Sequence, residues 1–242
     1  MKFFIVLLLT FAFAKADVPI KVFGNVATKG INEKLLERIE SLREILRNGN
    51  ASLGLPVMDP LVMKDQKVSL DSKLFSGDVA LDKLIVSALS DYQVQKAEFA
   101  MVGLKLTLGM QWSDLKGKGA YGVKGVALNF INIYGSGNFK LMVSDFSFTT
   151  TISLGTNPRN KTMLIKEMAT SVVLGDLQFT IDGLFNDKDL SDVTSAIVSD
   201  LAPGVVEKYQ KQLTEAVHTF VMSEANKVLS TMTLKDLLAL IQ

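Results

Sequence analysis

Few residues in this 242-residue chain could do chemistry. His218 is the single histidine and there is no cysteine. This excludes cysteine nucleophiles, Cys/His zinc sites and metal motifs with two histidines. No Gly-x-Ser-x-Gly elbow supplies a serine for His218 to activate. His218 follows Val217 beside an apolar stripe, so we interpret it as a packing or boundary residue. We expect a protein that is not an enzyme and uses no cofactor or metal.

One motif has the spacing of a phosphate-binding loop. Residues 117–122 read Gly-Lys-Gly-Ala-Tyr-Gly and match Gly-x-Gly-x-x-Gly. A dinucleotide site requires a strand before this motif and a helix after it, within a β-α-β unit. Residues 123–128 are instead strand-like and contain a further glycine. We therefore expect a glycine-bent hairpin here and no phosphate site.

The N-terminus has the pattern of a secretory signal. Lys2 is followed by an apolar run over residues 3–14, and Ala14-Lys15-Ala16 has small residues where cleavage requires them. That run, about a dozen residues, is too short to span a bilayer; a buried N-terminal helix is the alternative. We expect a signal peptide over residues 1–16 and a single secreted, extracellular domain over residues 17–242, without stable membrane insertion.

Charge and composition limit the classes of binding partner that we expect. Hydrophobic residues make up 48% of the chain, which is enough for a substantial core. Once Lys2 and Lys15 leave with the signal, 24 basic residues remain against 25 acidic ones. A near-neutral chain without a basic block argues against nucleic acid and against adhesion to acidic lipid by charge alone. The triplets beginning at Asn50 and Asn160 match the glycosylation signal, so we expect glycans there.

Two helices are predicted from apolar spacing. The first covers residues 31–46, has mixed charges on its other face and ends at Gly49, as a surface helix packed on a core would. The second runs from Asp189 to Leu229, about 60 Å, with a kink expected at Pro203. An equally long part of the protein must cover the apolar stripe of this helix. The stripe consists of Leu190, Val193, Ile197, Leu201, Val205, Tyr209, Leu213, Val217, Phe220 and Val228.

Residues 67–181 alternate with a period of two and predict an antiparallel sheet. Residues 102–112 form the clearest strand, with Val102, Leu104, Leu106, Leu108, Met110 and Trp112 on one dry face. The apolar phase shifts by one residue after Val123, Phe130 and Val143, which is typical of bulges or tight bends. We therefore expect a strongly coiled sheet, with a hairpin tip at residues 157–160.

Several segments together resemble the insect takeout and haemolymph juvenile-hormone-binding family over about residues 31–237. They are Leu53-Gly54-Leu55-Pro56-Val57-Met58-Asp59-Pro60-Leu61, Gly119-Ala120-Tyr121-Gly122-Val123-Lys124-Gly125, Ile133-Tyr134-Gly135-Ser136-Gly137-Asn138-Phe139 and Gly183-Leu184-Phe185-Asn186. None of them is catalytic; they mark the fold. Takeout-type proteins usually carry a cysteine pair near the mature N-terminus, and this chain departs from that pattern.

The resemblance implies an α+β fold, in which a long kinked C-terminal helix is wrapped by a strongly coiled antiparallel β-sheet, with an additional N-terminal amphipathic helix. The same architecture occurs in lipid-binding proteins related to bactericidal permeability-increasing protein and, more distantly, in mite group 7 allergens. The resemblance also implies an elongated hydrophobic tunnel between helix and sheet that carries a small lipophilic ligand, such as a terpenoid hormone, a fatty acid or a ubiquinone-like lipid.

The expected tunnel lining combines the dry strand faces with the helix stripe. It consists of Val102, Leu104, Leu106, Leu108, Met110, Trp112, Tyr121, Phe130, Phe146, Phe148, Phe179, Ile181, Leu213, Val217 and Phe220. Each is first of all a core residue, and alternation does not separate a hollow interior from a filled one. The alternative function is an extracellular interaction module with a closed interior that binds a protein receptor or a microbial lipid surface.

Overall fold

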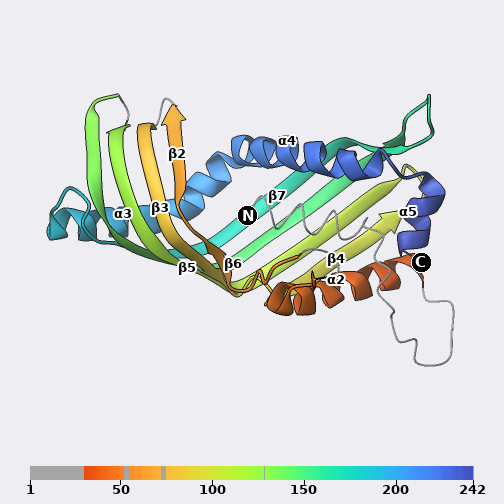
Figure 1. Cartoon of the computed structure of the whole chain (residues 1–242), viewed down its shortest axis with the longest axis horizontal. Helices are drawn as coiled ribbons and strands as arrows, with labels where there is room; N and C mark the ends of the chain where they lie inside the picture. Colours follow the sequence, from red (N-terminus) through yellow and green to blue (C-terminus); the bar gives the residue numbers. More distant parts are fainter. Residues whose placement is uncertain (1–29, 52–54, 72–74, 128, 242) are drawn as a thin grey trace.

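The computed structural model describes residues 30–51, 55–71, 75–127 and 129–241, so the expected signal peptide and Ser52 lie outside it. One antiparallel sheet has the order β1-β3-β5-β6-β7, with β2 also on β3 and β4 on β5 (Figure 1). Among the described residues, no helix has the length and apolar character needed to cross a membrane. The elements are α2 (Ile31–Asn48), β1 (Leu61–Met63), β2 (Gln66–Asp71), β3 (Phe75–Ser87), β4 (Tyr92–Ala100), β5 (Lys105–Ala127), β6 (Ile131–Thr156), β7 (Met163–Ile181), α3 (Lys188–Lys208), α4 (Gln210–Leu229) and α5 (Leu234–Ile241).

A long hairpin of β5 and β6 is the framework of the sheet. Its register is unbroken from Lys105 opposite Ser153 to Ala127 opposite Ile131. The expected phase shift after Phe130 is the tight turn of this hairpin, where the Phe130 amide donates to the Ala127 carbonyl at 3.1 Å. The glycine motif at residues 117–122 lies inside β5 and no helix follows it. It is therefore strand, neither the hairpin we expected nor a dinucleotide loop.

The sheet changes its buried side-chain parity along one row, Ser113–Asp145–Gly175, which we call the crease. Before it, even-numbered residues such as Trp112 and Phe148 are buried; beyond it, odd-numbered residues such as Tyr121 face the same side. Asp145 has φ 50°, and the ladder omits this row in both strand pairings. The bend predicted after Val143 is thereby confirmed, and it lets one sheet curl without a loss of register.

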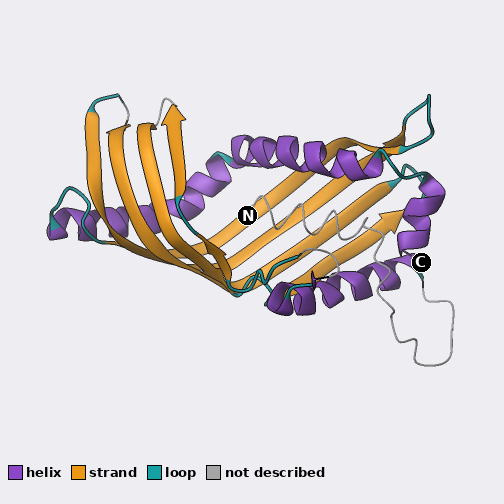
Figure 2. Cartoon of the chain, in the orientation of Figure 1, coloured by secondary structure: helices purple, strands orange, loops and turns teal. Residues whose placement is uncertain are grey.

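On one side of the crease the sheet is covered by helices. Figure 2 shows α2, α4 and α5 against this half. The predicted N-terminal helix is confirmed, and it buries Leu35, Ile39, Leu42 and Leu46 before ending at Gly49, φ 69°. Val221 and Leu229 of α4 and Leu237 of α5 complete the same core cluster. This half of the molecule is therefore filled by native side chains.

The C-terminal helical segment is two helices, α3 and α4, and the break between them is at Tyr209, whose φ and ψ are −104° and 17°. Pro203 lies inside α3, and the kink expected there stays a prediction. The strand predicted from Val102 begins only at Lys105, because residues 101–104 form a turn with Gly103 and Leu104 at positive φ. The break at Tyr209 and the late start of the strand are both places where backbone geometry overrides a continuing apolar pattern.

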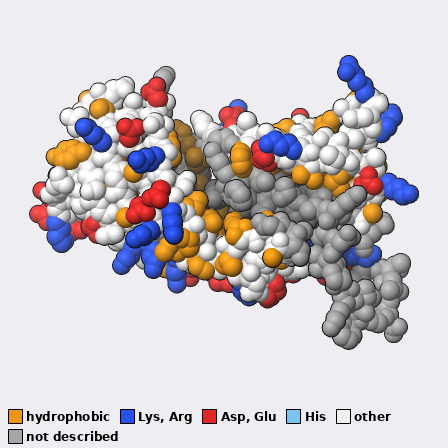
Figure 3. Space-filling view, in the orientation of Figure 1, with side chains coloured by type: hydrophobic (Ala, Val, Ile, Leu, Met, Phe, Trp, Pro, Cys, Tyr) orange, Lys and Arg blue, Asp and Glu red, His pale blue; other side chains and the backbone are white. Residues whose placement is uncertain are grey.

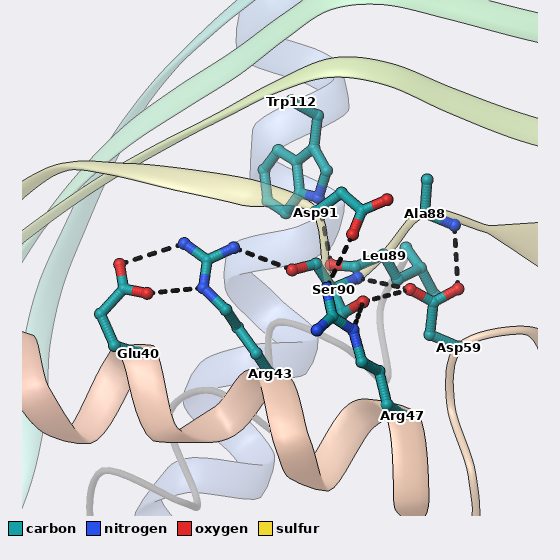
Figure 4. A network of polar contacts seen from close by, with 9 residues as sticks. All are labelled: Glu40, Arg43, Arg47, Asp59, Ala88, Leu89, Ser90, Asp91 and Trp112. Atoms are coloured by element: carbon teal, nitrogen blue, oxygen red, sulfur yellow. Dashed lines mark hydrogen bonds and ion pairs between the residues drawn. The ribbon is translucent and has the colours of Figure 1, made fainter.

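The segment around Asp59 clamps the turn between β3 and β4 (Figure 4). The Asp59 carboxylate accepts hydrogen bonds from the Ala88 amide at 2.9 Å and from the amide and hydroxyl of Ser90 at 2.8 and 2.5 Å. Arg47 and Arg43 of α2 donate to the Ser90 hydroxyl and carbonyl, both at 2.9 Å. The described part of that motif, residues 55–61, thus marks the fold because its Asp59 ties α2 to the sheet; residues 53 and 54 lie outside the described residues.

A second set of contacts explains the glycine-rich segments at residues 119–125, 133–139 and 183–186. The Tyr121 hydroxyl donates to the Asp182 carbonyl at 2.8 Å, and the Asp182 carboxylate accepts the Asn138 amide at 2.7 Å. A Cβ on Gly137 would collide with Asp182, and one on Gly135 with the Gly183 carbonyl. The separate motifs therefore meet where the β5–β6 hairpin supports the link from β7 into α3.

Candidate ligand-binding site

Many of the predicted lining residues meet in the half of the molecule that α2, α4 and α5 cover, which we call the filled half. Leu106, Leu108, Met110, Trp112 and Phe148 are buried in its core, and Leu104, Phe146 and Val217 pack against that core. The Trp112 ring lies 5.9 Å from Tyr92, 5.8 Å from Phe146 and 5.9 Å from Phe148, between ring centroids. Sequence alternation correctly placed these side chains on one dry face. In this half, however, they contact other native side chains.

Tyr92, which the sequence reading did not single out, anchors α2 to this cluster. Its hydroxyl donates to the Ile39 carbonyl at 2.5 Å, and the Arg43 guanidinium lies 4.1 Å from its ring centroid. Burial raises the pKa of the Tyr92 hydroxyl far above its usual value. These contacts fix α2 against the sheet.

The remaining predicted residues are spread over the molecule. Phe179 and Ile181 of β7 are half-buried beyond the crease, near buried Tyr121, and Phe220 is half-buried on α4. Val102, Phe130 and Leu213 are 92%, 76% and 49% exposed. The two expected glycosylation positions differ: Asn160 is exposed in the predicted hairpin tip, whereas Asn50 is half-buried next to α2.

The stripe of α3 was expected to be buried, and this expectation is wrong. Its members keep between 47% and 58% of their surface exposed, and we call them the apolar ridge: Leu190, Val193, Ile197, Leu201 and Val205. The buried residues of α3 are Ser191 and Ser195. The helix therefore has the reverse of the usual amphipathic arrangement, in which the apolar face docks on the protein.

Polar side chains fix the helices to the edge of the sheet. The hydroxyls of Ser191, Ser195 and Ser199 accept hydrogen bonds from the amides of Leu184, Ile181 and Phe179 at 3.1, 3.1 and 2.9 Å. Further along, the Gln210 side chain pairs with both the amide and the carbonyl of Val172 at 3.2 Å. An edge strand has unpaired backbone groups, and these side chains satisfy several of them. Hence α3 docks through hydrogen bonds.

The part of the sheet beyond the crease, which we call the curled half, presents a second apolar surface. Directly paired residues share a face, so the rows Val68–Val79–Val123 and Leu81–Tyr121 lie on one side of the sheet. This surface, the apolar arm face, continues the side that carries Phe179 and Ile181, and it consists of Val68, Leu70, Phe75, Val79, Leu81, Tyr121 and Val123. The alternation of Val68 with Leu70 and of Val79 with Leu81 was the sequence signal for it.

The arm face and the ridge are not packed on one another. Val68 and Leu70 are 46% and 45% exposed, similar to the ridge. Figure 3 shows a recess beside the curled half, at left, with hydrophobic side chains along its wall. A separate depression of about 370 Å³ lies mainly on the opposite, polar face, beside Lys116, Lys118 and Lys140.

His218 takes part in a short hydrogen-bond chain between α4 and the sheet. The Thr170 hydroxyl donates to Thr150 Oγ1 at 2.8 Å and lies 2.8 Å from His218 Nε2. A hydroxyl has one proton, so Thr170 accepts from Nε2–H. Burial lowers the pKa of His218, opposed by the charge of Glu215. This arrangement agrees with the packing role expected from the sequence.

The model of the haemolymph juvenile hormone binding protein family matches residues 4–239. The α+β architecture and this match define the class, which consists of binding proteins rather than enzymes. The chain belongs to the haemolymph juvenile hormone binding protein family, as its segments suggested. No curated protein matches the chain by sequence.

The chain is similar to several solved structures, one of which supports the fold. Takeout 1 of Epiphyas postvittana is 18% identical, with a TM-score of 0.56 over 82% of this chain and 94% of that chain. This likeness supports the fold of a coiled antiparallel sheet with a long C-terminal helical arm. A lipopolysaccharide binding protein is 14% identical, with a TM-score of 0.34 over 86% of this chain and 40% of that chain.

Proposed function

We propose that the protein is a secreted carrier that binds a small hydrophobic ligand between the α3 helix and the curled half of the sheet. The observation that carries this proposal is the pair of uncovered apolar surfaces, the apolar ridge and the apolar arm face. Asp192 lies on the flank of α3 away from the ridge, whereas Asp200, seven positions after Val193, borders the apolar flank that carries the ridge. The apolar flank is the one suited to lie beside the face that holds Phe179 and Ile181, so the two surfaces enclose the ligand.

The energetics favour an apolar guest. Full burial of a Val, Leu or Ile side chain stabilises by about 1.5–3 kcal/mol, so covering a half-exposed one contributes about 1 kcal/mol. At that value the five ridge residues contribute about 5 kcal/mol, and the arm face adds to this before the cost of association is subtracted. Few polar contacts are needed where apolar burial supplies most of the binding free energy.

The proposal moves the ligand away from much of the lining expected from sequence. Leu106, Leu108, Met110, Trp112 and Phe148 already have native partners in the filled half. Of the residues expected at the site, Tyr121, Phe179 and Ile181 remain beside the proposed space. A ligand there is hidden from water by the sheet on one side and by α3 on the other.

A matched pair of variants tests the proposal. Val193 on the ridge and Val173 on β7 are both 55% exposed. Val193→Asn should weaken binding of a fluorescent fatty-acid probe about fivefold, because it removes about 1 kcal/mol of apolar contact. Val173→Asn should leave binding unchanged. Equal effects of the two substitutions would count against this location.

Native mass spectrometry of the secreted protein tests carriage itself. We expect a bound lipid of a few hundred daltons in material from the secreting tissue. Protein that is repeatedly empty and does not bind the fluorescent probe would instead support an interaction module with a closed interior.

A further inference from the structure

The apolar ridge of α3 ends in a positive charge on the same line. At about 100° per residue, Lys208 follows Leu201 by seven positions and Ile197 by eleven, which places it within about 20° of both around the helix. The ridge from Leu190 to Val205 is about 22 Å long, and Lys208 extends the line to about 27 Å. An apolar strip with a cation at one end matches a molecule that has a long hydrocarbon chain and an anionic head.

The ammonium group of Lys208 is available for such a head. Lys208 is exposed, and no ion pair of its side chain occurs within the described part of the chain. Its Nζ lies 5.4 Å from the centroid of the Tyr209 ring, a cation–π contact that orients it at the break between α3 and α4. By contrast, Lys188 at the other end of α3 is already paired with Asp192.

We propose that Lys208 is the head-group site for an anionic amphiphile whose hydrocarbon chain lies along the apolar ridge. The inference rests on the proposed carrier function, and it adds the orientation of the ligand along α3 and the chemical class of the ligand. The carboxylate lies at the C-terminal end of α3, and the chain runs toward Leu190. The five ridge residues are uncharged and apolar, and Thr194, four positions after Leu190 on the same line, adds a hydroxyl but no charge. Lys208 therefore distinguishes a carboxylate from a neutral molecule with the same chain.

Calorimetric titration with oleate and with oleyl alcohol, its neutral counterpart, tests this at neutral pH. The wild-type chain should bind oleate about threefold to tenfold more tightly, because the ion pair forms at a partly screened position. Lys208→Met keeps the apolar stem and removes the charge. It should abolish the preference for oleate while leaving the affinity for oleyl alcohol within about twofold. Added salt should reduce the preference in the wild type only.

Lys188→Met is the matched control at the opposite end of α3. It should keep the preference for oleate. Loss of the preference in Lys188→Met but not in Lys208→Met would reverse the proposed direction, and equal affinities for both ligands in the wild type would overturn the head-group site. Failure to bind either ligand would instead contradict the carrier function, so the two failures are distinguishable.

Discussion

At the scale of the residue, a lone histidine turns out to be part of a contact between helix and sheet. His218 faces Thr170, which in turn faces Thr150, a threonine only 5% exposed. The desolvation that lowers the pKa of His218 means that its neutral form is favoured in the folded chain. Protonation at Nδ1 leaves the Nε2–H donation to Thr170 in place but puts a positive charge at a desolvated position, so it destabilises the folded chain.

We predict a pH dependence of stability that His218 causes. The pKa is lowered from 6.5 on folding, so the unfolded chain binds the proton more readily. The stabilisation is fully present above pH 6.5 and is lost as the pH falls from 6.5 toward the lowered value. Urea unfolding at pH 7.5 and pH 5.5 measures the loss, and His218→Gln should reduce the difference between the two pH values. An identical pH dependence in wild type and variant would contradict the assignment.

At the scale of the element, α3 shows that an apolar stripe does not always mark the docking face. Backbone groups inside a helix are hydrogen-bonded to one another, but those along the free edge of β7 lack partners within the sheet. Serine hydroxyls can bond to the strand edge and to their own helix. Ser195 and Ser199 accept from the strand and also donate back to helix carbonyls four residues earlier, at 2.8 and 2.9 Å. The demand of the strand edge for partners therefore decides which face of α3 docks.

The serine contacts predict local rather than global effects of substitution. In Ser195→Ala/Ser199→Ala, the amides of Ile181 and Phe179 lose their partners, and each lost hydrogen bond costs about 1 kcal/mol. Hydrogen exchange at these two amides should accelerate about fivefold. Thr219→Ala is the control, since the Thr219 hydroxyl bonds only within α4, to the Glu215 carbonyl. Unchanged exchange at both amides would show that the serines do not fix α3.

At the scale of the whole molecule, the crease divides one sheet into two differently used halves. In the half with α2, α4 and α5, the apolar faces are matched and form a packed core. In the curled half, the ridge and the arm face stay partly exposed because polar side chains, not apolar ones, position α3. A stable half can thus support an open one without a separate domain.

The cysteine-free chain permits a direct test that both apolar surfaces face one ligand. Single substitutions Val193→Cys on the ridge and Val79→Cys on the arm face should react more slowly with a maleimide when oleate is bound, by about fivefold or more. Val173→Cys should react at the same rate with and without oleate. Protection of only one of the first two positions would show that the surfaces do not face the same space.

The sequence by itself determined the main parts of the chain in order, namely a first helix, an antiparallel sheet and a C-terminal helical segment. Alternation and helical spacing depend on local geometry, so the sheet, α2 and the bend after Val143 could be predicted from the residues. Glycine markers such as Gly135 and Gly137 could be recognised in the sequence, although the reason for them is a distant contact, since a Cβ there would strike the link into α3. The family resemblance rested on these same features.

Only the tertiary structure decided which apolar surfaces are covered. Periodicity finds an apolar face but not its partner, so Trp112 and Ile197 look alike in sequence although one is 2% exposed and the other 51%. The difference comes from distant pairing. Trp112 meets side chains of β4 and β6, whereas the edge of β7 takes up the serine face of α3 and leaves Ile197 turned away.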